Sequence, residues 1–181
     1  MRIRATLALL AAIAAGAAAP PARAGDRREV DRDARQALEK LYAKQDSARL
    51  LGEHAKGVLV FPSIVKAGFM FGGQIGNGVL FKDGKRVGFY NSTAASYGFQ
   101  AGLQVFGYAL FFMNDEALAY LDKSAGFELG VGPSVVVVTA GMGKSLTSTT
   151  LTQDVYAFIF DQKGLMGGIG VQGSKITRLS D

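Results

Sequence analysis

The chain contains no cysteine, so it has no disulfide bond and no thiol that could carry a covalent lipid anchor. It has one histidine, His54, which lies beside Glu53 and Lys56, where a solvated side chain is ordinary. A structural zinc site needs more such ligands. The chain also lacks a Gly-x-Ser-x-Gly motif, and its acidic residues fall mostly in expected turns and helix ends rather than in acid–base pairs. We therefore expect no enzyme activity, no cofactor and no metal.

Two glycine-rich stretches resemble nucleotide-binding motifs but lack the context that those motifs require. Residues 168–173 match G-x-G-x-x-G, yet too little chain follows for the helix and the later acidic residue of a dinucleotide site. Residues 143–145 resemble the end of a P-loop, but Val138 stands where that loop requires glycine. We interpret the first stretch as a strand and the second as a strand entering a turn. For the second, an anion-binding nest of backbone N–H groups is the alternative.

The first 24 residues have the pattern of a signal peptide. An arginine-containing start precedes an apolar run over residues 5–19, which is shorter than the roughly 20 residues needed to cross a bilayer. Residues 22–24, Ala-Arg-Ala, fit the cleavage pattern, so we expect cleavage after Ala24 and a periplasmic or secreted protein; a retained anchor is the alternative. From residue 25 on, 17 basic residues face 15 acidic ones, and this small excess does not indicate nucleic-acid binding.

After the expected signal peptide, we predict an N-terminal helical segment over residues 25–55 and a β-rich part over 56–181, together forming one compact unit. Apolar residues recur at helical spacing from Asp26 to Leu51, the other face carries charges of both signs, and Gly52 is the expected stop. We expect the apolar stripe of this helix to pack on the domain. Contact of the helix with a membrane is the alternative.

From residue 58 on, the apolar pattern changes to the alternation of β-strands. The odd positions from Ala67 to Phe81 are mostly bulky and apolar, whereas the even positions are mostly glycine. Asp83-Gly84 predicts a two-residue hairpin, and a short helix is expected over Glu116–Lys123, with its start near Asn114. The other expected strands are 58–61, 86–91, 96–113, 128–139, 155–160, 165–171 and 176–179, with a turn at 161–164.

These patterns predict an α+β fold. An N-terminal amphipathic helix precedes a highly curved, barrel-like, glycine-rich antiparallel β-sheet with one short helix inserted. We expect Gly76, Gly78, Gly102 and Gly168 to be structural, because a side chain there would meet facing backbone or overpack. The alternative is a small outer-membrane β-barrel protein, which the length, export and alternation would permit. Its usual terminal aromatic residue is missing here.

Eight short stretches follow one another in an order that is known from one family. They are 56–62 (KGVLVFP), 66–69 (KAGF), 76–80 (GNGVL), 97–104 (YGFQAGLQ), 113–114 (MN), 141–144 (GMGK), 155–158 (VYAF) and 163–168 (KGLMGG). As an ordered set they resemble the SYLF-domain family, a lipid-binding module that is also described as actin-binding in some eukaryotic members. The Trp and Pro that often follow the hairpin in that family are missing here.

The resemblance implies a non-catalytic domain that binds phospholipid and associates peripherally with a membrane surface. Lipid contact would fall to cationic groups near apolar side chains. Nucleic acid is not expected as a partner, and neither is actin if the chain is exported. The candidate lipid-binding residues are Lys56, Lys66, Lys144 and Lys163, with Phe69 and Met70 as apolar contacts.

Overall fold

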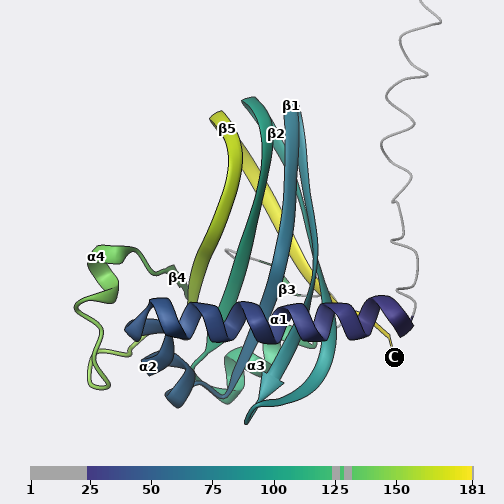
Figure 1. Ribbon diagram of the computed structural model, residues 1–181. Helices are drawn as coiled ribbons and strands as arrows, with labels where there is room; N and C mark the ends of the chain where they lie inside the picture. The colour runs from purple at the N-terminus through teal and green to yellow at the C-terminus, as the bar shows by residue number, and fades with distance from the viewer. Residues whose placement is uncertain (1–23, 124–126, 129–131, 181) are drawn as a thin grey trace, which may run out of the picture.

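The computed structural model describes residues 24–123, 127–128 and 132–180 (Figure 1). Three long strands form its body: β1 (Gly57–Lys82), β2 (Lys85–Phe112) and β5 (Val155–Arg178). Two helices precede these strands, and short elements lie between β2 and β5, so the predicted α+β class is confirmed. The helices and short strands are α1 (Ala24–Lys44), α2 (Asp46–His54), α3 (Asp115–Leu121), β3 (Phe127–Glu128), β4 (Val135–Val137) and α4 (Ala140–Gly143).

β2 is the middle strand of the sheet and pairs antiparallel with both long neighbours. It pairs with β1 from Gly57 opposite Phe112 to Lys82 opposite Lys85, and with β5 over nearly the same length. β3 adds a short antiparallel pairing to β5, whereas β4 lies parallel to β5. The sheet is thus curled and largely antiparallel, as predicted, with β4 as the exception.

The expected strand segments merge into longer strands. β1 runs without interruption through Pro62, which lies where the pairing with β2 shifts register. Because β1 is an edge strand, the missing N–H of proline need not cost a ladder hydrogen bond. The expected turn at 161–164 is absorbed into β5 as an irregularity with positive φ at Asp161 and Gly164. The strand expected over 128–139 is wrong in extent, because the described part of it holds only the end of β3 and the three residues of β4.

The hairpin predicted at Asp83-Gly84 joins β1 to β2. The two residues have φ values of 50° and 71°, which are the left-handed conformations that a two-residue hairpin turn requires. Asn114 also has its predicted role at the start of α3, where its side chain accepts a hydrogen bond of 2.8 Å from the backbone N–H of Ala117.

The three long strands turn over near their middle, so that each rises and descends once (Figure 1). In β1 the turn lies at Met70, which has a φ of 61°, a left-handed conformation that is uncommon for a residue with a side chain. Gly68 and Gly72 flank it so closely that a Cβ on Gly68 would lie 2.7 Å from the Cα of Gly72. The sequence therefore places glycines where the strand closes on itself.

Two of the four glycines that we predicted to be structural face the other half of β1. A Cβ on Gly76 would lie 2.8 Å from the carbonyl oxygen of Ser63, and one on Gly78 would lie 2.6 Å from that of Val60. The expected collision with facing backbone is therefore found at both. Gly102 has a φ of 143°, which a side chain would strain. The surroundings of Gly168 lie outside the described residues.

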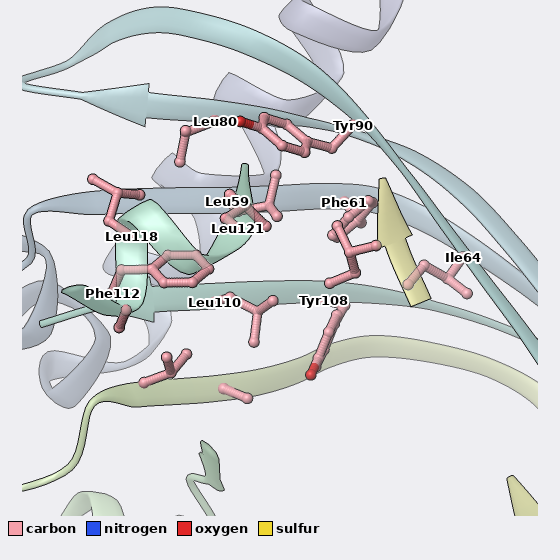
Figure 2. Close-up of a cluster of buried hydrophobic side chains, with 14 of the residues drawn as sticks. Leu59, Phe61, Ile64, Leu80, Tyr90, Tyr108, Leu110, Phe112, Leu118 and Leu121 are labelled. Carbon is pink, nitrogen blue, oxygen red and sulfur yellow. The ribbon is translucent and has the colours of Figure 1, made fainter. Parts of the chain in front are cut away.

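The sheet is covered on both faces near the end where α1 crosses it. We call one face the α3 face, because Leu118 and Leu121 of α3 pack there among aromatic and aliphatic side chains of the long strands (Figure 2). We call the other the α1 face, where Ala34 and Leu41 of α1 are buried against the sheet. The sheet residues buried beneath α1 and α2 include Val58, Val60, Val79, Phe81, Phe89, Ala109, Phe111, Tyr156 and Phe158.

The N-terminal helix differs from its prediction at its end. It breaks at Gln45, which has extended backbone angles, and α2 then continues through Gly52 to His54. Gly52 is not a helix stop. A Cβ there would lie 2.7 Å from Cζ of Tyr42, so glycine makes room for this ring of α1. The apolar stripe of α1 packs on the domain, as expected.

Candidate functional site

The end of the sheet where the long strands turn over carries an unusual surface. We call this end the tip, and define it as residues 66–72 of β1, 96–104 of β2 and 163–172 of β5, which lie opposite one another in the strand pairing. Figure 1 shows the turn of the long strands at the top, whereas α1 crosses the sheet near its opposite end, which we call the base. Of the eight stretches that resemble the SYLF family, 66–69, 97–104 and 163–168 meet there.

Large apolar side chains at and beside the tip are open to solvent. Leu165 is 88% exposed, Phe69 76% and Phe71 65%, whereas Leu59, Phe111 and Phe158 are buried. The rings of Phe71 and Tyr97 lie 5.0 Å apart and form one aromatic pair across β1 and β2. Soluble proteins rarely leave such a group uncovered unless it is an interaction surface. The exposed group comprises Val65, Phe69, Met70, Phe71, Ile75, Tyr97, Leu103 and Leu165.

Strand alternation places most of this group on the α1 face. Phe71 and Ile75 alternate in step with Val79, and Tyr97 in step with Phe89, and both of those residues are buried on the α1 face. Leu103 lies opposite Leu165 on the neighbouring strand. The face that α1 covers at the base therefore continues uncovered to the tip.

The tip is positively charged and contains no acidic residue in its three segments. Its charges are Lys66 and Lys163. Lys163 pairs with Val105 next to Leu103 and Leu165, so it shares their face and is exposed. Lys66 is half-buried and alternates with Ile64 on the α3 face. Of the two lysines, only Lys163 therefore lies among the exposed apolar side chains.

The six candidate residues from the sequence divide between the two ends of the molecule. Phe69, Met70, Lys66 and Lys163 lie at the tip. Lys56 immediately precedes β1 at the base, and Lys144 caps α4 beside an open groove of about 980 Å³ that Ser47 and Thr139 also line. Lys56 and Lys144 thus lie outside the tip segments, and Lys144 shares its groove with Lys44, which contacts Asp161 two residues before Lys163.

Sequence reasoning missed Phe71, Tyr97, Leu103 and Leu165 as candidate contacts. Their bulk was visible in the alternation, but alternation alone does not distinguish a buried face from an open one. The strand pairing supplies what was missing, because it brings segments from about 30 and about 100 residues along the chain to the same end.

Two acidic residues outside the tip, Asp122 and Asp154, have structural partners. Asp122 accepts a hydrogen bond of 2.6 Å from the hydroxyl of Tyr90 and forms an ion pair with Arg178. Burial, together with this hydrogen bond, raises the pKa of Tyr90. The backbone N–H of Ser134 and the amide of Asn114 lower the pKa of Asp154. Within the described ranges, no three His, Cys, Asp or Glu side chains gather as metal ligands do.

Asp161 of β5 forms ion pairs with the C-terminal part of α1. Lys40 and Lys44 of α1 reach it at 2.6 and 3.1 Å, and their hydrogen bonds lower the pKa of its carboxyl. Asp161 precedes the tip segment of β5 by two residues, so the contact joins the helix to the strand just before the tip.

None of the helices in the described part of the chain has the length and apolar character to cross a membrane.

Comparison with known proteins gives two findings. Residues 93–181 match the family described as Ysc84, Las17-binding protein actin regulator. The chain is also 28% identical over 131 residues to Protein YSC84 of Saccharomyces cerevisiae. This alignment covers 68% of the chain but only 28% of the yeast protein, so the chain spans little more than a quarter of that relative. The matched part contains β5 and most of β2, and with them two of the three tip segments. Both findings support the assignment of the chain to the SYLF-domain family.

Proposed function

We propose that the chain is a non-catalytic phospholipid-binding domain that associates weakly and reversibly with anionic membrane surfaces. The exposed apolar tip, with Lys163 among its side chains and no acidic residue in its segments, is the observation that carries this proposal. Apolar side chains gain free energy on entering lipid, and a lysine near an anionic surface adds about 1 kcal/mol. The proposal includes export, with residues 1–24 as the signal peptide, 25–55 as the helical segment and 56–181 as the β-rich part.

The distribution of charge supports a local rather than a long-range attraction. From residue 25 on, the chain has 17 basic and 15 acidic residues, and two of the basic ones are the tip lysines. The remainder of that chain is therefore balanced. An anionic surface would attract the protein at the tip, and the attraction would act only over about 8 Å at physiological ionic strength.

The experiment that tests this proposal is co-sedimentation of the intact protein with vesicles of phosphatidylcholine, with and without phosphatidylglycerol, at low salt. We expect binding to the anionic vesicles. K163Q should weaken it about fivefold, as the loss of about 1 kcal/mol implies. The matched control is the double variant K56Q/K144Q, which removes two lysines at the base and should leave binding nearly unchanged.

Failure of the protein to sediment with any vesicle composition at low salt would contradict the lipid-binding proposal. A protein partner would then be the better hypothesis, since the matched family is described by its binding to Las17 and its regulation of actin. If K56Q/K144Q weakened binding and K163Q did not, membrane binding would stand but would be assigned to the base.

A further inference from the structure

We propose that the tip enters a bilayer as a shallow wedge that stops at the boundary between headgroups and acyl chains, with α1 and α4 held outside. This inference rests on the proposed membrane binding and specifies its surface, depth and orientation. Its starting point is that apolar side chains are exposed both before and after the turn of β1, as Phe69 is on one side and Phe71 and Ile75 are on the other.

The direction in which β1 turns favours a partner that surrounds the tip on both sides. Gly68 and Gly72 approach each other on the α3 face, so β1 closes that face and opens the α1 face as it turns. Exposed side chains on the α1 face therefore diverge from the two sides of the turn. A flat protein surface could cover one side only, whereas lipid surrounds whatever enters it. The occupant that fits this surface is therefore a bilayer.

The edges of the sheet limit the depth of insertion. At the tip, β2 is paired on both sides, but β1 and β5 each have β2 as their one neighbouring strand within the described residues. In the described part of the chain, each outer edge thus presents backbone N–H and C=O groups without a strand partner. Such groups are costly in the hydrocarbon core, where no water can satisfy them, but not in the hydrated headgroup region. Insertion should therefore stop at the boundary.

Two side chains, Lys163 and Tyr97, also limit the depth of insertion. Lys163 lies two residues before Leu165 and shares its face, so the ammonium group can stay at phosphate level while the leucine enters the lipid. Tyr97 is 63% exposed beside Phe71, and a tyrosine prefers the interface, with its ring in an apolar and its hydroxyl in a polar environment. The expected depth is that of interfacial segments, about 5–10 Å.

The same geometry keeps the helices out of the membrane. Asp161, which Lys40 and Lys44 of α1 contact, precedes Leu165 by four residues of β5, or about 13 Å of extended strand. A tip inserted by about 5–10 Å therefore leaves α1 clear of the lipid. α4 also lies far below the turn of the long strands (Figure 1).

Because the chain has no cysteine, single cysteines can report on depth. L165C at the tip, S63C part-way along β1 and S148C at the base would each carry an environment-sensitive bimane. The probe vesicles contain phosphatidylglycerol, phosphatidylcholine and a lipid with a doxyl quencher at acyl carbon 5 or 12. We expect the label at position 165 to be quenched more by carbon 5 than by carbon 12. The labels at 63 and 148 should be quenched by neither.

A second measurement uses unlabelled variants in co-sedimentation. F69S and L165S should each weaken binding about tenfold, because an apolar side chain no longer enters the lipid. The matched control is V87S, which changes an exposed apolar residue of β2 near the hairpin at the base and should bind like the parent. Thermal melts check that F69S and L165S remain folded. F69L keeps an apolar side chain at position 69 and should bind almost as the parent does, which separates the loss of apolar character from the change of residue.

The outcomes separate this inference from the proposed function. Vesicles that never sediment the protein would overturn lipid binding itself. Sedimentation with quenching at position 63 or 148 and none at 165 would overturn the tip as the contact and leave lipid binding in place. Stronger quenching at 165 by carbon 12 than by carbon 5 would overturn the shallow depth. It would mean that the open strand edges find partners in the membrane, such as a second copy of the chain.

Discussion

Gly78 lies in β1 against an earlier part of the same strand, and its missing side chain is what permits this contact. A Cβ there would lie 2.6 Å from the carbonyl oxygen of Val60, a backbone atom that cannot move aside without shifting the strand. We expect G78A to lower the free energy of unfolding by about 1–3 kcal/mol, the usual cost of overpacking. Denaturant unfolding followed by circular dichroism measures this.

The matched control is G141A, because a Cβ on Gly141 would meet no atom within 4 Å. Its unfolding midpoint should equal that of the parent or rise slightly, since alanine favours the helical conformation of α4. Equal midpoints for G78A and G141A would contradict the close packing of the two halves of β1.

Single glycines show what a sequence can and cannot predict at this scale. The role of Gly76 and Gly78 followed from their place on a bare strand face, because alternation alone says which positions share a face. Gly52 was misinterpreted as a helix stop. Its actual role depends on the ring of Tyr42, ten residues away on a different helix, and no local pattern specifies that contact.

α1 and β5 are joined at Asp161, and this link between elements should depend on pH. Lys40 and Lys44 lower the pKa of the carboxyl below its ordinary value of 3.8. A lowered folded-state pKa adds stability above the unfolded-state pKa, and that stability is lost as the pH falls through the folded-state pKa. We therefore expect D161N to be less stable than the parent at pH 7, by at most about 1 kcal/mol because the pair is partly exposed. The difference should disappear once the pH falls below the folded-state pKa.

Thermal melts of parent and D161N at pH 7 and at a descending series of acidic pH values measure this difference. E29Q is the control, because Glu29 pairs with Arg32 within α1 and joins no two elements. A D161N variant as stable as the parent at pH 7 would show that the ion pair does not help to hold α1 on the sheet.

At the scale of elements, the sequence predicted the types of structure better than their connections. The helix, the hairpin at Asp83-Gly84 and the alternating strands were all visible locally. The continuity of β1 was not, because Pro62 ordinarily interrupts a strand and only its edge position permits it here. Local patterns were also insufficient to assemble the candidate site. Placing Lys163 beside Leu103 requires the pairing of β2 with β5, which joins residues about 60 apart in the chain.

Across the whole molecule, the apolar face continues from a covered base to an uncovered tip. α1 and α2 cover it at the base, where Phe81 and Phe111 are buried. Beyond the helices, the same face carries Leu103 and Leu165, both exposed. The α1 face is therefore buried under the helices at one end of the sheet and exposed to solvent at the other. Under the proposed function, membrane binding would be the sum of a charged and an apolar part.

The two parts should separate in a salt titration of vesicle binding. The attraction between Lys163 and an anionic surface is screened as the Debye length falls from about 10 Å at 0.1 M salt to about 3 Å at 1 M, whereas apolar contact is not screened. Binding of the parent should therefore fall with salt and level off at a residual value. K163Q should start closer to that value, and L165S should lower the value itself. Complete loss of binding at 1 M salt would show that charge alone holds the protein. No change with salt would show that Lys163 contributes nothing, and the tip would then act through its apolar side chains alone.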